Sequence, residues 1–175
     1  MLHAMTKSTA PDEPKTVPEA HQHNLLSAEA AVRLVRSGNR VFVGTTPATS
    51  RTLLAALEAV EQPAVGVELV HFLVQGAVAL DAAGQPTTKY RHHCFFAGAE
   101  MRSLIREGRA DYHSISIARV PEMFDIGRIR LDVALIQVTP PDAFGYVSLG
   151  LAVDVVAAAV RNARLVIAEI NPAMP

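Results

Sequence analysis

The sequence predicts a doubly wound α/β domain with a mostly parallel sheet of about six strands and helices on both faces. Helix and strand patterns alternate about six times between Leu25 and Ile170. Several of the strands are continuous apolar runs, which is typical of a parallel sheet covered on both sides. The chain has few aromatic residues and many Ala and Val, so helices can lie close on β-branched strands.

Local sequence signals mark where individual helices begin and end. The first helix, over 25–39, has Ser27 as a good N-cap and is stopped at Gly38. A short helix over 120–127 has Pro121 in its first turn. The other elements are expected in this order: strand 40–44, helix 49–62, strand 66–74, a long connection 75–90, strand 90–98, helix 99–108, strand 111–117, and, after the short helix, strand 132–138, helix 153–163 and strand 165–170.

The first 23 residues predict a disordered N-terminal arm, because they carry three prolines and almost no apolar periodicity. The ordered domain is then expected over residues 24–175. His21 and His23 in the arm could suggest a metal, but two histidines on a flexible arm are more often solvated. We therefore expect no metal site.

Composition and charge exclude several classes of function. The chain has 175 residues, enough for one domain with a real core. Its formal net charge is −1 at pH 7, so nothing points to nucleic acid or an anionic membrane. No apolar run reaches membrane-spanning length, and the N-terminus lacks the apolar region of a signal peptide. The single cysteine, Cys94, fits a reducing compartment, so we expect a soluble cytoplasmic protein.

Short polar or glycine-bearing turns follow the expected strands. In a parallel sheet these turns gather at the carboxyl edge, where open α/β sheets bind ligands. Glycine lets a ligand approach the backbone, and helix N-termini offer N–H groups to an anion. The turns contain, in chain order, Gly44-Thr45, Gln75-Gly76, Gly98, Ser116, Thr139 to Asp142, and Asn171-Pro172.

The loop "TPPDAFGY", residues 139–146, follows the most apolar strand and has two interpretations. Its prolines restrict the chain, so little entropy would be lost if it bound a ligand. The same residues also make a good turn, in which Asp142 bonds its own backbone. The motif alone leaves both interpretations open.

Other single residues favour structural roles. Cys94 lies in an apolar strand and is interpreted as a small core residue. His92 and His93 are expected on opposite faces of one strand, so they cannot chelate one metal together. Asp111 and His113 share a face and could form a base and its orienting group, although a solvated strand end is the more common outcome.

The segment "DYHSISIARVPEMFDIGRIRLDVALIQVTPPDAFGYVSLGLAVD" resembles the N-terminal half of the acetyl-CoA hydrolase/transferase family. These are class I CoA-transferases such as acetate and 4-hydroxybutyrate CoA-transferases. "RHHCFFAGAEMRSLIREG" also looks like a family block. The chain departs from the family pattern at Phe144, Thr139, Ala48 and Ser50, where the family has histidine, serine, glycine and proline.

The resemblance implies a function for the whole enzyme. Family members move CoA between an acyl-CoA and a small carboxylate, or to water, through a glutamyl-CoA intermediate, with the CoA thioester as substrate and no other cofactor. The glutamate belongs to a C-terminal half that has no counterpart here, so we assign no catalytic residue to this chain, and we interpret Glu169 as structural. The implied partners are that C-terminal half and further copies of the chain.

The resemblance and the strand-end positions together nominate the residues of a substrate pocket wall. These are Gly44, Thr45, Gly98, Ser116, Pro140, Pro141, Asp142, Gly145 and Tyr146. Two other functions remain open at this point: a non-catalytic CoA-binding module, and one subunit of a two-chain CoA-transferase.

Overall fold

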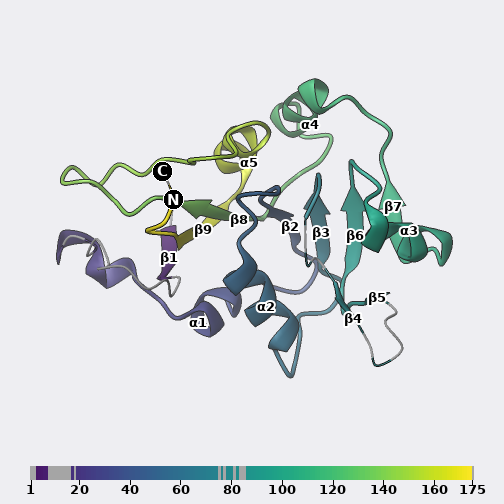
Figure 1. Cartoon of the computed structure of the whole chain (residues 1–175), viewed down its shortest axis with the longest axis horizontal. Coiled ribbons are helices and arrows are strands. Elements are labelled where there is room, and N and C mark those ends of the chain that lie inside the picture. The colour runs from purple at the N-terminus through teal and green to yellow at the C-terminus, as the bar shows by residue number, and fades with distance from the viewer. Residues whose placement is uncertain are drawn as a thin grey trace.

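The computed structural model describes residues 3–7, 17, 19–74, 76, 78–80, 82 and 86–174. Its main feature is a seven-stranded sheet with the order β1-β9-β8-β2-β3-β6-β7, in which every pair of neighbours is parallel (Figure 1). The predicted fold class is therefore confirmed. The strands are β1 (His3–Lys7), β2 (Arg40–Val43), β3 (Glu68–His71), β6 (Arg91–Cys94), β7 (Ala110–Tyr112), β8 (Val133–Val138) and β9 (Leu165–Ile170).

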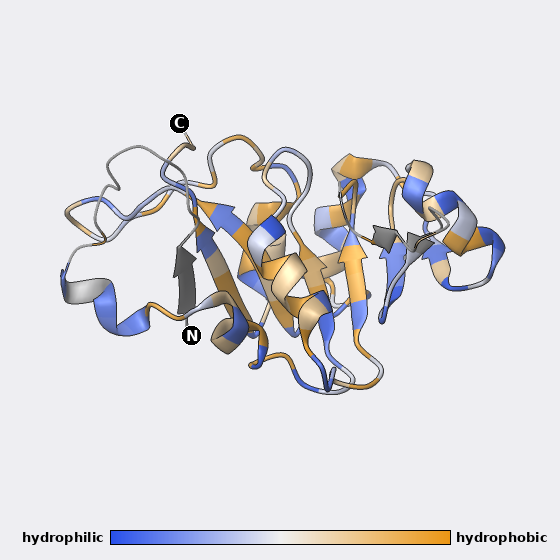
Figure 2. Cartoon of the chain, turned by 60° about the horizontal axis from the view of Figure 1, so that its bottom comes forward, coloured by the Kyte–Doolittle hydropathy of each residue, from blue (hydrophilic) through white to orange (hydrophobic). Residues whose placement is uncertain are grey.

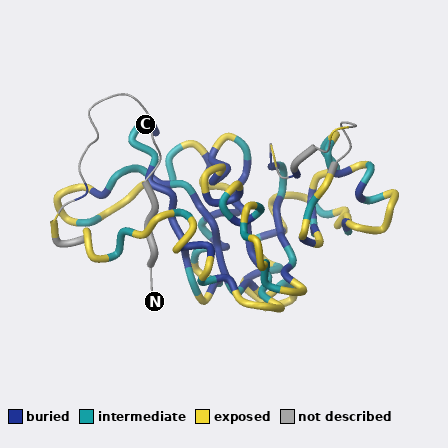
Figure 3. Tube along the Cα trace, turned by 90° about the horizontal axis from the view of Figure 1, so that it is seen from below, coloured by how far each residue is buried: buried dark blue, intermediate teal, exposed yellow. Residues whose placement is uncertain are grey.

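Helices cover both faces of this sheet. On one face, α1 (Ala28–Val32), α2 (Arg51–Ala59) and α3 (Ala99–Arg106) contribute to a core with strand residues such as Val41 and Leu69. On the other face, α4 (Val120–Asp125) and α5 (Val156–Asn162) pack with Phe42 and Val70. The central strands are mostly hydrophobic and buried, as Figures 2 and 3 show.

The structure corrects the expectation of a disordered arm over residues 1–23. His3–Lys7 form β1 at the edge of the sheet, paired in parallel with β9, and Glu19–Asn24 form a 3-10 helix, η1. An edge strand can form through backbone hydrogen bonds alone, so it needs no apolar periodicity in its sequence. Residues 1, 2, 8–16 and 18 lie outside the described part of the chain.

Several other segments differ from expectation. The helix expected over 25–39 is shorter, since α1 covers only Ala28–Val32, and the strands expected over 66–74 and 90–98 are reduced to β3 and β6. The long connection over 75–90 contains a small antiparallel pair, β4 (Ala79–Leu80) with β5 (Pro86–Thr87). The strand expected over 111–117 is shorter, because β7 ends at Tyr112 and a 3-10 helix, η2, starts at Ile117. Among the described residues, no helix is long and apolar enough to cross a membrane.

The strand order places a topological switch point between β2 and β8. From β2 the chain builds the sheet in one direction through β3, β6 and β7, and it then returns to build β8 and β9 on the other side of β2. The connections from β2 and β8 therefore diverge at the carboxyl edge, and such a switch point is the usual ligand position in open α/β sheets.

Candidate functional site: the carboxyl edge of the sheet

The loop after β2 turns back sharply at the switch point. Gly44 donates its N–H to the Leu135 carbonyl at 2.9 Å, which extends the pairing with β8 by one residue. A Cβ at Gly44 would lie 2.9 Å from the Ala48 carbonyl oxygen, a backbone atom that cannot rotate away. Glycine is therefore required for this turn, and Thr45 is buried directly after it.

This loop is hydrogen-bonded to the loops on both sides of it. The Thr45 hydroxyl donates to Asp154 Oδ2 at 3.1 Å, which joins it to the segment that leads into α5. On the other side, Thr46 donates to the Leu73 carbonyl after β3 from its N–H at 2.8 Å and from its hydroxyl at 2.6 Å. The connections that follow β2, β3 and β8 are thus joined by hydrogen bonds through Thr45, Thr46, Leu73 and Asp154, and we call these joined connections the rim.

The loop over 139–146 is held by its own hydrogen bonds. Asp142 Oδ1 accepts from the N–H of Phe144 at 2.9 Å and of Tyr146 at 2.8 Å. Thr139 closes the base, because its Oγ1 accepts from the Ser148 N–H at 2.9 Å. Asp142 therefore organises the loop, as the turn interpretation predicted. The same bonds fix the position of the loop's exposed tip, Phe144 to Tyr146.

The side chains of that tip extend into solvent. Phe144 is 84% exposed and Tyr146 is 75% exposed, whereas Pro141 is buried and Pro140 half-buried. Gly145, at the turn, has φ 85°, a left-handed conformation that favours glycine. The rigid base and exposed aromatic tip make this loop suited to contacting a ligand or another polypeptide.

The other two nominated residues lie farther along the same edge. Gly98 is the N-cap of α3, beyond β6, and a Cβ there would lie 3.1 Å from Leu73 Cδ1. Ser116 is exposed four residues past the end of β7, the outermost strand. β2, β3 and β6 separate β7 from β8, so the structure does not bring Ser116 together with the loop over 139–146.

The helix N-termini at this edge differ in whether their first N–H groups are free to bind an anion. Glu169 is 2% exposed and caps α2, since its Oε2 accepts from the N–H groups of Thr52 at 3.0 Å and Leu53 at 3.3 Å. Its Oε1 accepts from the Thr52 hydroxyl at 3.0 Å. Asp154 caps α5 through the N–H groups of Val155 and Val156. The expectation that helix starts here would receive an external anion is therefore wrong for α2 and α5.

The same geometry supports the structural interpretation of Glu169. Its carboxylate is saturated by the start of α2 and by Gln137, whose Nε2 lies 3.4 Å from Oε1. Asp154, in contrast, was not nominated from the sequence. An aspartate just before an apolar helical run is a recognisable N-cap signal, but its bond to Thr45 joins positions 109 residues apart and has no local signature.

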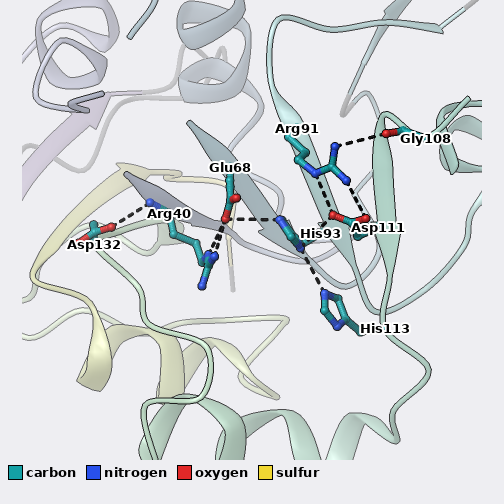
Figure 4. Close-up of polar contacts among 8 residues, drawn as sticks. All are labelled: Arg40, Glu68, Arg91, His93, Gly108, Asp111, His113 and Asp132. Carbon is teal, nitrogen blue, oxygen red and sulfur yellow. Dashed lines mark hydrogen bonds and ion pairs between the residues drawn. The ribbon is translucent and has the colours of Figure 1, made fainter. Parts of the chain in front are cut away.

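A row of polar side chains crosses the sheet face that also carries α4 and α5 (Figure 4). Arg40 pairs with Glu68 at 2.6 Å, and Arg91 forms two hydrogen bonds with Asp111, at 2.9 and 2.8 Å. Burial raises the pKa of Glu68, but the Arg40 hydrogen bond and charge outweigh it and leave the pKa below its usual value. The Arg91 hydrogen bond likewise lowers the pKa of Asp111.

His93 stands in the middle of this row. Its Nδ1 lies 3.2 Å from His113 Nε2 and 3.6 Å from Asp111 Oδ2. Since both Asp111 oxygens already accept from Arg91, this carboxylate is mainly an ion-pair partner and not a dedicated orienting group for His113. Burial lowers the pKa of His113, and the His93 charge adds to this effect. We interpret the row as a network of ion pairs that joins neighbouring strands, in which His93 Nε2 lies 3.4 Å from Glu68 Oε2 without forming a hydrogen bond.

A second histidine pair lies on the opposite face of the sheet. His71 is 2% exposed, His92 is 0% exposed, and His71 Nε2 lies 3.1 Å from His92 Nδ1. His92 and His93 thus point to opposite faces, as predicted. Among the described residues, no group of three or more His, Cys, Asp or Glu side chains is placed to hold a metal. Cys94 is buried, and burial raises the pKa of its thiol, as expected for a core residue.

Comparison with known proteins gives these features a family context. The family model for the acetyl-CoA hydrolase/transferase N-terminal domain matches residues 10–175. The chain is 35% identical over 157 residues to a 4-hydroxybutyrate coenzyme A transferase from Clostridium kluyveri, covering 90% of this chain and 36% of that protein. It is 35% identical over 144 residues to a succinyl-CoA:acetate/propanoyl-CoA:succinate CoA transferase from Fasciola hepatica, covering 81% and 29%.

Solved structures agree with the sequence comparison. RipA from Yersinia pestis is 26% identical with a TM-score of 0.72, over 86% of this chain and 37% of that one. A 4-hydroxybutyrate CoA-transferase from Porphyromonas gingivalis is 26% identical with a TM-score of 0.61, over 90% and 35%. The chain spans about a third of the length of the curated relatives that it matches. It belongs to the acetyl-CoA hydrolase/transferase family and corresponds to its N-terminal domain.

Proposed function

We propose that this chain is the N-terminal domain of an enzyme that moves CoA between an acyl-CoA and a small carboxylate, or to water. In this proposal its carboxyl-edge loops form one wall of the substrate pocket. The observation that carries it is the rim at the β2/β8 switch point, where the Gly44–Thr46 turn is bonded to Asp154 on one side and to Leu73 on the other. The named relatives are CoA-transferases, which supports the same class of reaction.

The rim residues have distinct roles in this proposal. Gly44 allows the sharp turn after β2, and Thr45 holds that turn through its bond to Asp154. Pro140 and Pro141 stiffen the base of the 139–146 loop, while the exposed Tyr146 offers a hydroxyl. The exposed Phe144 and Tyr146 rings would also lie against a second domain or subunit, since apolar side chains exposed together often mark an interface.

The nucleophile is proposed to come from outside this chain. A glutamate carboxylate attacks the thioester carbonyl, CoA thiolate leaves, and an acyl-glutamyl anhydride forms. CoA thiolate then attacks the glutamyl carbonyl and releases the carboxylate, leaving glutamyl-CoA, from which CoA passes to the acceptor acid by the reverse steps. Glu169 already caps α2 and Cys94 is a buried thiol with a raised pKa, so neither is placed for this attack. The CoA thioester is the substrate and no further cofactor is proposed.

A second arrangement has its own support. A chain from the AibA/AibB decarboxylase shares the fold with a TM-score of 0.56 at 16% identity, and the match covers 76% of that chain. This fold therefore also occurs in a chain not much longer than one such domain. The nucleophile could accordingly be supplied by a separate subunit in a CoA-transferase of two chains. A cytoplasmic location and assembly of several copies remain part of the proposal.

The test is acetyl-CoA consumption with acetate or succinate as acceptor. We expect no turnover by the purified 175-residue chain and turnover when a C-terminal half from the same family is supplied, fused or as a separate chain. The separate-chain arm distinguishes the two arrangements. Turnover on the usual enzyme scale of about 1–10³ s⁻¹ by the 175-residue chain alone would show that the nucleophile lies within it.

A further inference from the structure

A cavity of about 370 Å³ opens on the sheet face that carries α4, between the segment that follows β7 and the turn that ends α4. Its volume falls within the range of pockets that hold small organic ligands. None of the four residues that define the rim lines this cavity, and neither does the loop over 139–146. The cavity is therefore separate from the proposed substrate wall.

The walls of the cavity are mainly apolar. Phe95 is 3% exposed, and its ring meets the Phe124 ring edge to face with 6.4 Å between the centroids. Ile115, Met123 and Ile129 also line the cavity, and they remain partly exposed. An apolar ligand body would remove more of these side chains from water, which favours binding.

Three polar side chains complete the lining: His113, Ser114 and Arg128. All three residues are exposed, so a ligand can reach them from solvent. The Ser114 hydroxyl makes no hydrogen bond with any described residue and is available as a donor. The cavity thus combines apolar walls with a few accessible polar groups, which is the usual composition of a site for a small molecule.

Arg128 supplies the positive charge of the cavity and has no partner in the described part of the chain. No residue there forms a hydrogen bond or an ion pair with its guanidinium. Two acidic residues close to it in the sequence are engaged elsewhere: Asp125 accepts from Asn162 Nδ2 at 2.7 Å, and Asp132 accepts from the Arg40 N–H at 2.9 Å. The partner that this charge lacks is therefore an anion from outside the chain.

The turn that ends α4 holds Arg128 on an ordered backbone. Three N–H groups after the helix donate to its last carbonyls at 3.0 Å each, from Ile126 to Glu122, from Gly127 to Phe124 and from Ile129 to Met123. Unpaired carbonyls at a helix C-terminus carry partial negative charge and repel an anion. Because these carbonyls are paired, that repulsion is reduced beside Arg128.

His113 lies on the β7 side of the cavity and adds no negative charge. Its Nε2 lies 3.2 Å from His93 Nδ1, at the end of the polar row in Figure 4. Burial lowers the pKa of His113 below its usual value, so the ring is mainly neutral at pH 7.5. The nearby Asp111 carboxylate is paired with Arg91 through both oxygens. The charge that the cavity offers to a ligand is therefore that of Arg128.

The single unpaired guanidinium decides the class of ligand. A guanidinium binds a carboxylate or a phosphate through two parallel N–H bonds. A phosphate monoester carries about 1.5 to 2 negative charges at pH 7, so one cation leaves part of this charge unpaired beside apolar walls, which is costly. A carboxylate carries one charge and matches Arg128. The apolar walls favour an acid whose remaining part is apolar and compact.

We propose that this cavity binds a monocarboxylic acid with a compact apolar body. Its carboxylate pairs with Arg128 and accepts from the Ser114 hydroxyl, while its body lies against Phe95, Ile115 and Met123. This second ligand site goes beyond the proposed transfer of CoA and does not depend on it, because the rim takes no part in it. A binding measurement without turnover therefore tests it.

The test compares three probes that separate charge from apolar body. Phenylacetate has both, 2-phenylacetamide keeps the ring but is neutral, and acetate keeps the charge but has almost no apolar body. NMR titration of the isotope-labelled 175-residue chain at pH 7.5 reports which amides respond and how tightly each probe binds there. We expect phenylacetate to shift the amide signals of residues 113–115 and 123–129, and to bind there about ten-fold more tightly than either other probe.

Two matched variants identify the cation. Arg128→Gln removes the charge of the cavity, so the affinity for phenylacetate should fall to that for 2-phenylacetamide. Arg130→Gln removes the same charge at a neighbouring arginine outside the cavity lining, and it should change the affinity by less than about two-fold. Both arginines are exposed, so we expect both variants to fold.

The unmodified chain alone can refute the proposal. Equal affinities for phenylacetate and 2-phenylacetamide would show that the cavity does not recognise the carboxylate. The absence of shifts in residues 113–115 and 123–129 would show that the acid does not bind there. Equal losses of affinity in Arg128→Gln and Arg130→Gln would also overturn it, because they would reduce the effect to a general attraction between the acid and a positive surface.

Discussion

Replacing Glu169 tests whether this buried carboxylate holds α2 or takes part in chemistry. In Glu169→Ala the first turn of α2 loses two backbone hydrogen bonds, from Thr52 and Leu53, and one hydroxyl bond. Loss of an N-cap costs about 1 kcal/mol and up to about 2 kcal/mol. Thr52 is exposed, so water can reach it, whereas Leu53 is buried and its N–H would be left unpaired.

The buried N–H adds about 1–3 kcal/mol, and the space left by the side chain adds more. We therefore expect Glu169→Ala to lower the free energy of unfolding by about 3 kcal/mol. Glu169→Gln keeps the shape and one accepting oxygen but loses the charge, and we expect a cost of about 1 kcal/mol.

Urea unfolding of the 175-residue chain measures both changes. The control is Glu107→Ala, which removes an exposed carboxylate paired loosely with Arg109 at 3.4 Å and should change the free energy of unfolding by less than about 0.5 kcal/mol. The reasoning is refuted if Glu169→Ala unfolds at the same urea concentration as the unmodified chain. It is also refuted if Glu169→Gln stays fully stable but abolishes turnover in the complete enzyme, since that pattern belongs to a nucleophile.

Three further predictions follow from the same structure. Because the pKa values of His71 and His92 fall from 6.5 to about 4 and about 3 on folding, the unfolded chain binds more protons between these values and 6.5. The free energy of unfolding should therefore be at its full value above pH 6.5 and fall as the pH drops toward 4, by up to about 1.4 kcal/mol per pH unit for each histidine. A urea midpoint that stays constant from pH 7.5 to 5 would contradict this. Gly44→Ala places a Cβ 2.9 Å from a backbone oxygen and should destabilise the chain by about 1–3 kcal/mol in urea unfolding, so an unchanged midpoint would show that the turn can relax. Asp142→Ala and Tyr146→Phe should raise KM or lower kcat in the complete enzyme with stability changes below about 1 kcal/mol, whereas normal kinetics with a large loss of stability would make the loop a turn only.

Periodicity was enough to predict the order of the elements that pack in the core but not their lengths, since α1 covers only Ala28–Val32 of the helix expected over 25–39. The strand expected over 165–170 coincides with β9, and the Ser27 N-cap accepts from the Ala30 N–H at 3.2 Å as anticipated. β1 could not be predicted, because an edge strand is held mainly by backbone groups that carry no side-chain pattern. The strand over 111–117 was drawn too long because alternation continues into residues that are exposed loop in the structure.

The candidate site was predictable only where it depends on local chain chemistry. The turn after β2 and the self-bonded Asp142 loop follow from glycine, proline and aspartate positions. The capping of α2 by Glu169 joins residues 117 apart, and the His71–His92 pair joins two strands. Such contacts depend on sheet order and register, which one sequence does not show, and they decide which helix starts remain open to a ligand.

The most direct test of the account is hydrogen exchange of the complete protein with and without acetyl-CoA. The central claim is that the carboxyl edge of this domain is a wall of the acyl-CoA pocket. It predicts slower exchange on binding in residues 44–50 and 139–146, with no change in residues 61–66 and 127–131 at the opposite edge. Protection confined to the opposite edge, or no protection in this domain at an acetyl-CoA concentration that saturates turnover, would contradict it.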